Sequence, residues 1–159
     1  MKRYVTAILL CAALAGCADE FTRKQRKSAK EIEGLIQRNG TFIVYSLDPH
    51  PHEGPPNGGF HGYKVLGEKE ITNTEERRDL LTKLAQSIRQ NPEEMAACFD
   101  PRHGLRFKAP NELIDIVICF ECNQAHLHGA INKGFLLTTT GRTEFNNFLD
   151  KHQVQRSTY

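Results

Sequence analysis

Three cysteines and one histidine are the residues of this chain best suited to chemistry. Cys98 and His103 lie in one short segment, and Cys119 and Cys122 lie in another. Three thiolates and one imidazole suit tetrahedral zinc, and soft sulfur also suits cuprous copper. The same cysteines could instead form a disulfide, or supply a reactive thiol whose pKa a neighbouring imidazole would lower.

A predicted hairpin brings these two segments together. Residues 104–109 and 113–120 have the composition of strands, and the turn-forming pair Pro110-Asn111 lies between them. If Ala109 pairs with Glu112, the antiparallel register places the three sulfurs and the imidazole at the same end of the hairpin.

Among these alternatives, a disulfide is the expected state for an exported protein. It should include Cys98, because Cys119 and Cys122 would face opposite sides of a strand that continued through both. Zinc or copper binding, or a reactive thiol, is the alternative; otherwise no cofactor is expected.

Three charged residues could support this cluster. Arg102 could hold an anion beside a thiol, and Glu121 lies between the two cysteines of the second segment. Asp115 is the one acid in an otherwise apolar strand, so it should lie at an edge or pair with Arg102 or Arg106.

The remaining histidines are weaker metal candidates. His126 and His128 alternate, so they share one face of a strand and extend the cysteine pair to C-x2-C-x3-H-x-H. His50, His52 and His61 lie in a loop over 48–62 that is rich in proline and glycine. Exposed polar side chains are the simpler interpretation of both groups.

The N-terminus has the features of an export signal. Lys2 and Arg3 precede an apolar run over 5–14, which is too short to span a bilayer. The ending Leu14-Ala15-Gly16-Cys17 resembles a bacterial lipobox, in which the cysteine receives lipid such as palmitate and becomes the first mature residue. The sequence therefore predicts a signal peptide at 1–16, a lipidated tether at 17–27 and one domain at 28–159.

Hydrophobic periodicity predicts an α+β domain with a largely antiparallel sheet and flanking helices. Ser28 should begin the first helix and Asn39-Gly40 should end it in the left-handed conformation, while Thr72 and Glu75 fit a capping box for the next helix. Besides the hairpin, the expected elements are helices at 28–36, 74–90 and 142–152, and strands at 41–47, at 63–66 and within 123–139.

Charge limits the classes of partner. The chain carries 21 basic and 19 acidic side chains, and loss of Lys2 and Arg3 with the signal leaves these numbers equal. Nucleic-acid binding needs a clustered basic surface, so it is not expected. A membrane, reached through the lipid on Cys17, and a protein partner are the expected contacts.

The two motif segments resemble a family of small, uncharacterised bacterial exported proteins and lipoproteins. The resemblance rests on Cys-Phe-x-Pro-Arg-His-Gly over 98–104 and on Asp-x-Val-Ile-Cys-Phe-Glu-Cys over 115–122. It implies that these residues form one unit and assigns no substrate to it.

Taken together, the residues indicate a lipid-anchored protein of the cell envelope. Ala18 after the lipidated cysteine resembles the signal for outer-membrane sorting, which would place the domain in the periplasm. A non-catalytic binding or structural module with a disulfide is the expected function. The alternative is a metal or thiol site built from Cys98, His103, Cys119 and Cys122.

The lipid anchor is directly testable. Replacement of the acceptor thiol in Cys17→Ser should abolish incorporation of labelled lipid and leave the precursor uncleaved, as measured by metabolic labelling and intact mass. Cys11→Ser, a cysteine within the same signal, is the control and should be processed normally. Normal labelling and fractionation of Cys17→Ser would contradict the anchor.

Overall fold

The computed structural model describes residues 20–50, 59–90, 92 and 94–158. The lipobox and His52 lie outside these residues. The described part is an α+β domain built on one six-stranded sheet with helices packed against it. No helix within these ranges is long and apolar enough to cross a membrane.

The sheet is antiparallel throughout and has the strand order β2-β1-β3-β4-β5-β6. Ala109 pairs with Glu112 and His103 pairs with Ile118, so the predicted hairpin and its register are confirmed. The strands are β1 (Thr41–Leu47), β2 (Val65–Glu70), β3 (His103–Ala109), β4 (Glu112–Cys119), β5 (Gln124–His128) and β6 (Lys133–Leu136).

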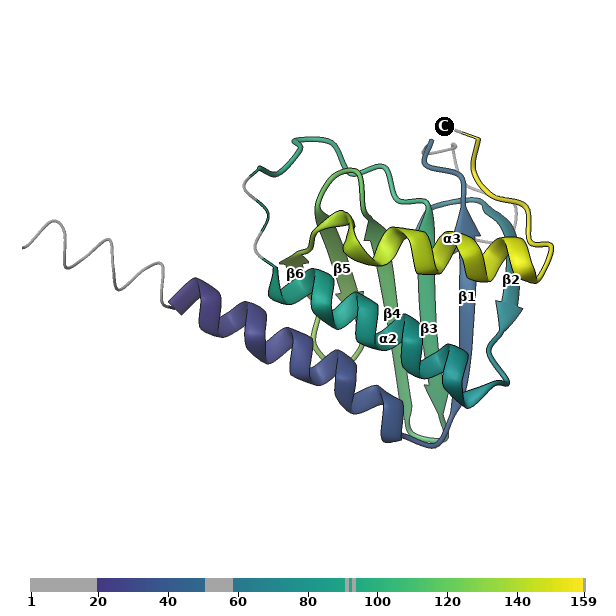
Figure 1. Cartoon of the computed structure of the whole chain (residues 1–159), viewed down its shortest axis with the longest axis horizontal. Helices are drawn as coiled ribbons and strands as arrows, with labels where there is room; N and C mark the ends of the chain where they lie inside the picture. Colours follow the sequence, from purple (N-terminus) through teal and green to yellow (C-terminus); the bar gives the residue numbers. More distant parts are fainter. Residues whose placement is uncertain (1–19, 51–58, 91, 93, 159) are drawn as a thin grey trace, which may run out of the picture.

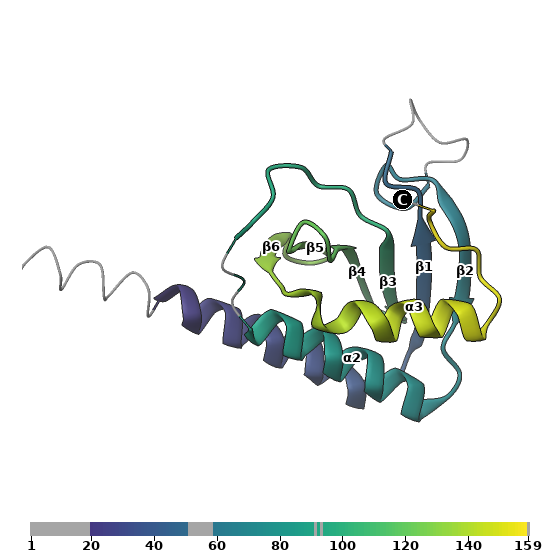
Figure 2. The same cartoon turned by 45° about the horizontal axis from the view of Figure 1, so that its top comes forward.

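Helices cover one face of the sheet. A helix at residues 20–34, here called the N-terminal helix, lies with α2 (Thr74–Arg89) and α3 (Arg142–Lys151) on the same side (Figures 1 and 2). Short 3-10 turns follow the first helix at Leu35–Gln37 and precede α3 at Thr139–Gly141.

The main core lies between the helices and the sheet. Alternation along β4 directs Ile116 and Ile118 into this core and Val117 to the opposite face, as the pattern of an extended strand requires. The predicted apolar stripe of α2, from Leu80 to Ile88, faces the same core.

The N-terminal helix is longer than the sequence predicted. Residues 20–27, expected as part of a tether, are helical, and Ser28 lies buried inside the helix rather than at its start. The buried positions include Gln25, Ser28 and Ile32, spaced by three and four residues. Two of these three are polar, so this stripe does not read as apolar in the sequence.

The Gln25 side chain anchors this helix to the edge of the sheet. Its amide nitrogen donates to the Leu136 carbonyl at 2.8 Å, and its amide oxygen accepts from the Leu136 N–H at 3.3 Å. The amide therefore bonds both backbone groups of one residue of β6, as a neighbouring strand would.

Three local expectations were wrong. Asn73, not Thr72, caps α2, since its side chain accepts from the N–H groups of Glu75 and Glu76. The second strand begins at Val65 rather than Tyr63. Gly40 has no positive φ; a Cβ there would instead lie 2.7 Å from the Lys108 carbonyl oxygen.

The centre of β4 provides a test of the core. Ile118→Asp should bury an unpaired charge at a fully buried position and cost several kcal/mol, a large part of the stability of an ordinary domain. Leu113→Asp on the same strand is the matched control, because Leu113 is half exposed. Urea denaturation should show a much lower midpoint only for Ile118→Asp, and equal midpoints would contradict this assignment.

Candidate functional site

The disulfide of the motif joins Cys119 to Cys122, with an S–S distance of 2.03 Å. The expectation that it would include Cys98 was wrong, because β4 ends at Cys119 and the chain then turns rather than extending through both cysteines. Asn123, with φ at 57°, continues this turn toward β5. The turn brings the two sulfurs to the same side.

Cys98 is a free, exposed thiol near this disulfide. The Ala96 N–H donates to the Cys122 carbonyl at 3.3 Å, and the Asp100 N–H donates to Cys122 Sγ at 3.2 Å. Cys98 therefore lies between two residues that contact Cys122.

His103 lies on the other face of the sheet from Cys119. Its partner in the register is Ile118, so its ring points toward the helices, between Phe120 and Phe145. Its Nε2 lies 2.9 Å from Asn146 Oδ1 on α3. The four-residue metal set is thus not assembled, and no group of three or more histidine, cysteine or acidic side chains within the described ranges is placed to hold a metal ion.

Asp115 is the centre of a charged cluster on the face away from the helices. Arg106 binds its carboxylate through two hydrogen bonds of 2.7 Å each, and His61 Nε2 lies 2.8 Å from Oδ2. Burial on its own would raise the pKa of Asp115, but the hydrogen bonds from Arg106 and His61 outweigh it and lower that pKa. Asp115 therefore remains a carboxylate, paired with Arg106 and not with Arg102.

His61 reaches this carboxylate from a tight turn. His61 and Gly62 both have positive φ, at 53° and 89°, and the backbones of Phe60 and Tyr63 hydrogen-bond to each other on either side of them. This is the geometry of a two-residue hairpin turn that matches the twist of its strands.

Three histidines gather on this face. His61 stacks on His128 with ring centroids 3.9 Å apart, and Phe99 stacks on His126 at 4.2 Å. Burial, with contributions from the other two histidines, lowers the pKa of His128. Ring nitrogens direct their lone pairs within the ring plane, so stacked rings do not aim them at a common point.

The other candidate residues lie elsewhere. His50 Nδ1 lies 3.1 Å from Asp48 Oδ1 in an exposed position. Arg102 pairs with Glu121 at 3.0 Å, and Arg142 pairs with the same carboxylate at 3.3 Å. Arg102 and Glu121 therefore neutralise each other at the start of the β4–β5 turn.

An apolar groove of about 950 Å³ lies between the N-terminal helix and the strands β4, β5 and β6. Ile32, Leu127 and Phe135 contribute to its floor and also belong to the main core. Every large hydrophobic side chain that is exposed within the described ranges lines this groove, with exposed fractions of 40% to 72%: Phe21, Met95, Leu113 and Ile131.

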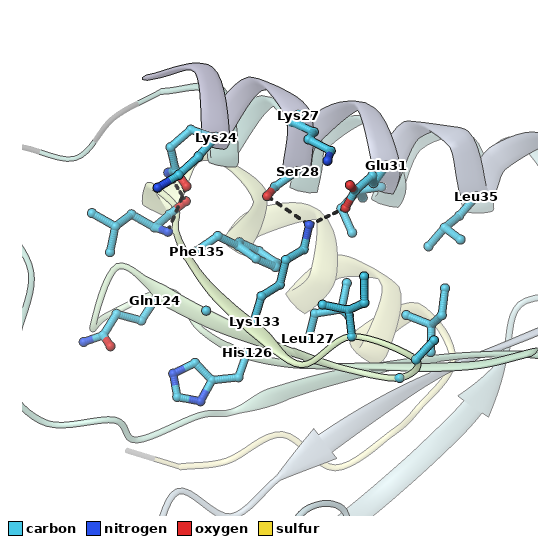
Figure 3. A pocket seen from close by; sticks show the side chains of 18 of the residues that line it. Lys24, Lys27, Ser28, Glu31, Leu35, Gln124, His126, Leu127, Lys133 and Phe135 are labelled. Atoms are coloured by element: carbon cyan, nitrogen blue, oxygen red, sulfur yellow. Dashed lines mark hydrogen bonds and ion pairs between the residues drawn. The ribbon is translucent and has the colours of Figure 1, made fainter. Parts of the chain in front are cut away.

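Lys133 bridges the two walls of the groove. Its side chain reaches from β6 toward the helix, where its ammonium donates to Ser28 Oγ at 3.2 Å and pairs with Glu31 (Figure 3). Arg38 on the helix side likewise pairs with Glu112 on β4. Hydrogen bonds and ion pairs thus connect the helix to the sheet on either side of the apolar surface.

Sequence reasoning did not predict this groove. Its exposed apolar residues come from four separate segments of the chain, so no single stretch of sequence contains them. The isolated Ile131, between Ala130 and Asn132 in the β5–β6 turn, was the one local signal that could have pointed to it.

Protonation of His103 should make stability depend on pH. Burial lowers the pKa of His103 to about 4, against about 6.5 for an unfolded chain. Between these values unfolding takes up a proton, so the free energy of unfolding decreases as pH falls. Between pH 7 and pH 5, protonation of His103 alone should lower the free energy of unfolding by about 2 kcal/mol. Urea denaturation at the two pH values measures this difference.

The variants His103→Phe and His50→Gln test that assignment. His103→Phe removes the buried imidazole and should lose this part of the pH dependence, while His50→Gln removes an exposed imidazole and should retain it. The same loss of stability at pH 5 in both variants would show that another group is responsible.

The chain matches no protein-family model, no curated protein and no solved structure.

Proposed function

We propose that this protein is a lipid-anchored binding module of the bacterial cell envelope, and that its groove binds the acyl chain of an anionic amphiphile. The observation that carries the proposal is the convergence of Phe21, Met95, Leu113 and Ile131 on one groove. Apolar side chains that gather in one concave region of a surface are typical of a binding site rather than of random exposure.

The volume and lining of the groove suit an acyl chain. About 950 Å³ lies within the range of ~300–1,000 Å³ that is usual for small-molecule sites. Each methylene moved from water into such a groove contributes ~0.8 kcal/mol of binding free energy. The affinity for a long acyl chain would therefore come mainly from the number of methylenes that it buries.

The charges along the groove favour an anionic head group. Four basic side chains line it, Lys24, Lys27, Arg38 and Lys133, against the two acidic residues Glu31 and Glu112. Arg38 and Lys133 pair with these acids, and Lys24 pairs with Glu20 on the exposed side of the helix. Lys27 has no acidic partner within the described ranges and is available to a carboxylate or phosphate.

The position of the groove in the chain fits a membrane-derived ligand. Its helical wall includes Phe21, only four residues after Cys17, the expected site of lipidation. An anchor at Cys17 would hold the groove close to the lipid surface. Basic residues next to such an anchor are attracted to anionic head groups by ~1 kcal/mol each.

Photocrosslinking of lipid probes in intact cell envelopes tests this function. A diazirine-bearing fatty acid should label peptides of the β5–β6 hairpin and of the N-terminal helix. Ile131→Asp places a carboxylate in the apolar groove and should reduce labelling about tenfold or more, because the chain would desolvate that charge. Asn147→Asp, on the exposed side of α3, is the matched control and should label as wild type does.

The head group is tested separately. Lys27→Glu should weaken labelling by the anionic probe while leaving labelling by the corresponding neutral fatty alcohol unchanged. Labelling spread evenly over the surface, or unaffected by Ile131→Asp, would rule out the groove as the acyl-chain site. Recovery of a crosslinked protein in its place would identify a different occupant.

A further inference from the structure

A second cavity, small and polar, lies between the sheet and α3. It has a volume of about 120 Å³, and Ser46 of β1 and His103 of β3 line it together with Arg102 and Asn146. Ser46 and His103 are direct partners in the β1–β3 register, so their side chains lie next to each other on the helix-covered face. This cavity is separate from the apolar groove.

Three buried polar atoms of this cavity have no hydrogen-bond partner: Ser46 Oγ, Arg102 Nε and His103 Nδ1. Ser46 is fully buried, and His103 is 3% exposed. A buried polar group without a partner costs free energy, so these three atoms around one cavity are placed to bind a polar occupant.

The hydrogen-bonding pattern defines what such a ligand must offer. Asn146 Oδ1 can only accept, so its bond of 2.9 Å to His103 Nε2 places the ring proton on Nε2. His103 Nδ1 is then an acceptor and Arg102 Nε a donor, while the Ser46 hydroxyl can act as either. The ligand must therefore both donate and accept hydrogen bonds.

The charges around the cavity favour an anion. Two guanidinium groups, of Arg102 and Arg156, line it against the single carboxylate of Glu121. Arg102 and Arg142 both pair with that carboxylate, and Arg156 pairs with Asp150 at 2.8 Å. Within the lining itself, positive charge exceeds negative charge.

We propose that this cavity is a binding site for a small oxyanion that carries a proton, of which hydrogen phosphate is the simplest example. The P–OH group donates to His103 Nδ1, and the other oxygens accept from Arg102 Nε and Ser46 Oγ. Sulfate has no proton at neutral pH, so it would direct lone pairs at the His103 lone pair. The site accounts for the side chains of Arg102 and His103 within the motif, and it does not depend on the acyl-chain groove.

Calorimetric titration of the purified full-length lipoprotein with inorganic phosphate and with sulfate, at pH 7 and equal ionic strength, tests the site. Phosphate should bind at one site per chain, at least tenfold more tightly than sulfate. Ser46→Ala removes a donor shared by both anions and should weaken both. Its matched control is Ser87→Ala, which removes a buried hydroxyl on α2 that bonds to the Gly141 N–H.

His103→Phe tests the acceptor. It should abolish the preference of phosphate over sulfate, bringing the two affinities to within about twofold. Equal binding of the two anions by wild type, or phosphate binding unchanged in both Ser46→Ala and His103→Phe, would overturn the assignment. No saturable phosphate binding at millimolar concentration would overturn the site itself and would leave water as the occupant.

Discussion

The helix-covered face of the sheet is the constraint on which the rest of the structure depends. Five of the six strands present a continuous apolar surface there, from Phe42 on β1 to Phe135 on β6, and that surface must be removed from water. The N-terminal helix, α2 and α3 provide the cover (Figure 2). Both cavities lie in this layer, where a helix and the sheet separate.

The two cavities differ because different side chains line them. The groove lies beside the shortest strand, β6, where the cover consists of the N-terminal helix and its polar contacts. The small cavity lies at one end of β1 and β3, where Ser46 and His103 interrupt an otherwise apolar row. Apolar walls suit an acyl chain, whose methylenes they remove from water. Unpaired polar atoms suit a ligand that is bound through hydrogen bonds.

The opposite face of the sheet has no helix layer; it carries a smaller apolar cluster, which includes Tyr45, Phe60 and Val117, and the charged group around Asp115. A buried carboxylate at Asp115 is stable there because Arg106 supplies the opposite charge and both Arg106 and His61 hydrogen-bond to it. The contact with His61 also fixes the 60–63 turn over the sheet. Phe60 then lies against Gly104, where a Cβ would come within 2.7 Å of the phenyl ring. The glycine of the first motif is therefore needed for close packing.

Sequence reasoning predicted those parts of the fold that follow from local pattern. The hairpin register, α2 and α3 were correct because turn chemistry and apolar spacing define them within a few residues. The N-terminal helix was misjudged because its buried stripe includes Gln25 and Ser28, whose burial depends on partners far along the chain.

Fewer contacts of the candidate sites could be predicted from the sequence. Asp115 was recognised as the odd acid of its strand, and Arg106 was among its expected partners. His61 was not, because it lies 54 residues away and reaches Asp115 only through the tertiary fold. The disulfide was misassigned because a strand was assumed to continue where the chain turns.

The amide of Gln25 has a consequence for the behaviour of the whole molecule. The outer edge of β6 would otherwise present unpaired backbone groups, which are a template for pairing with a strand of another chain. The same helix shields this edge and forms one wall of the groove. Its displacement would therefore expose unpaired backbone groups of β6 together with an apolar surface. The docking of one helix therefore determines whether this edge of the sheet and the apolar groove surface are covered.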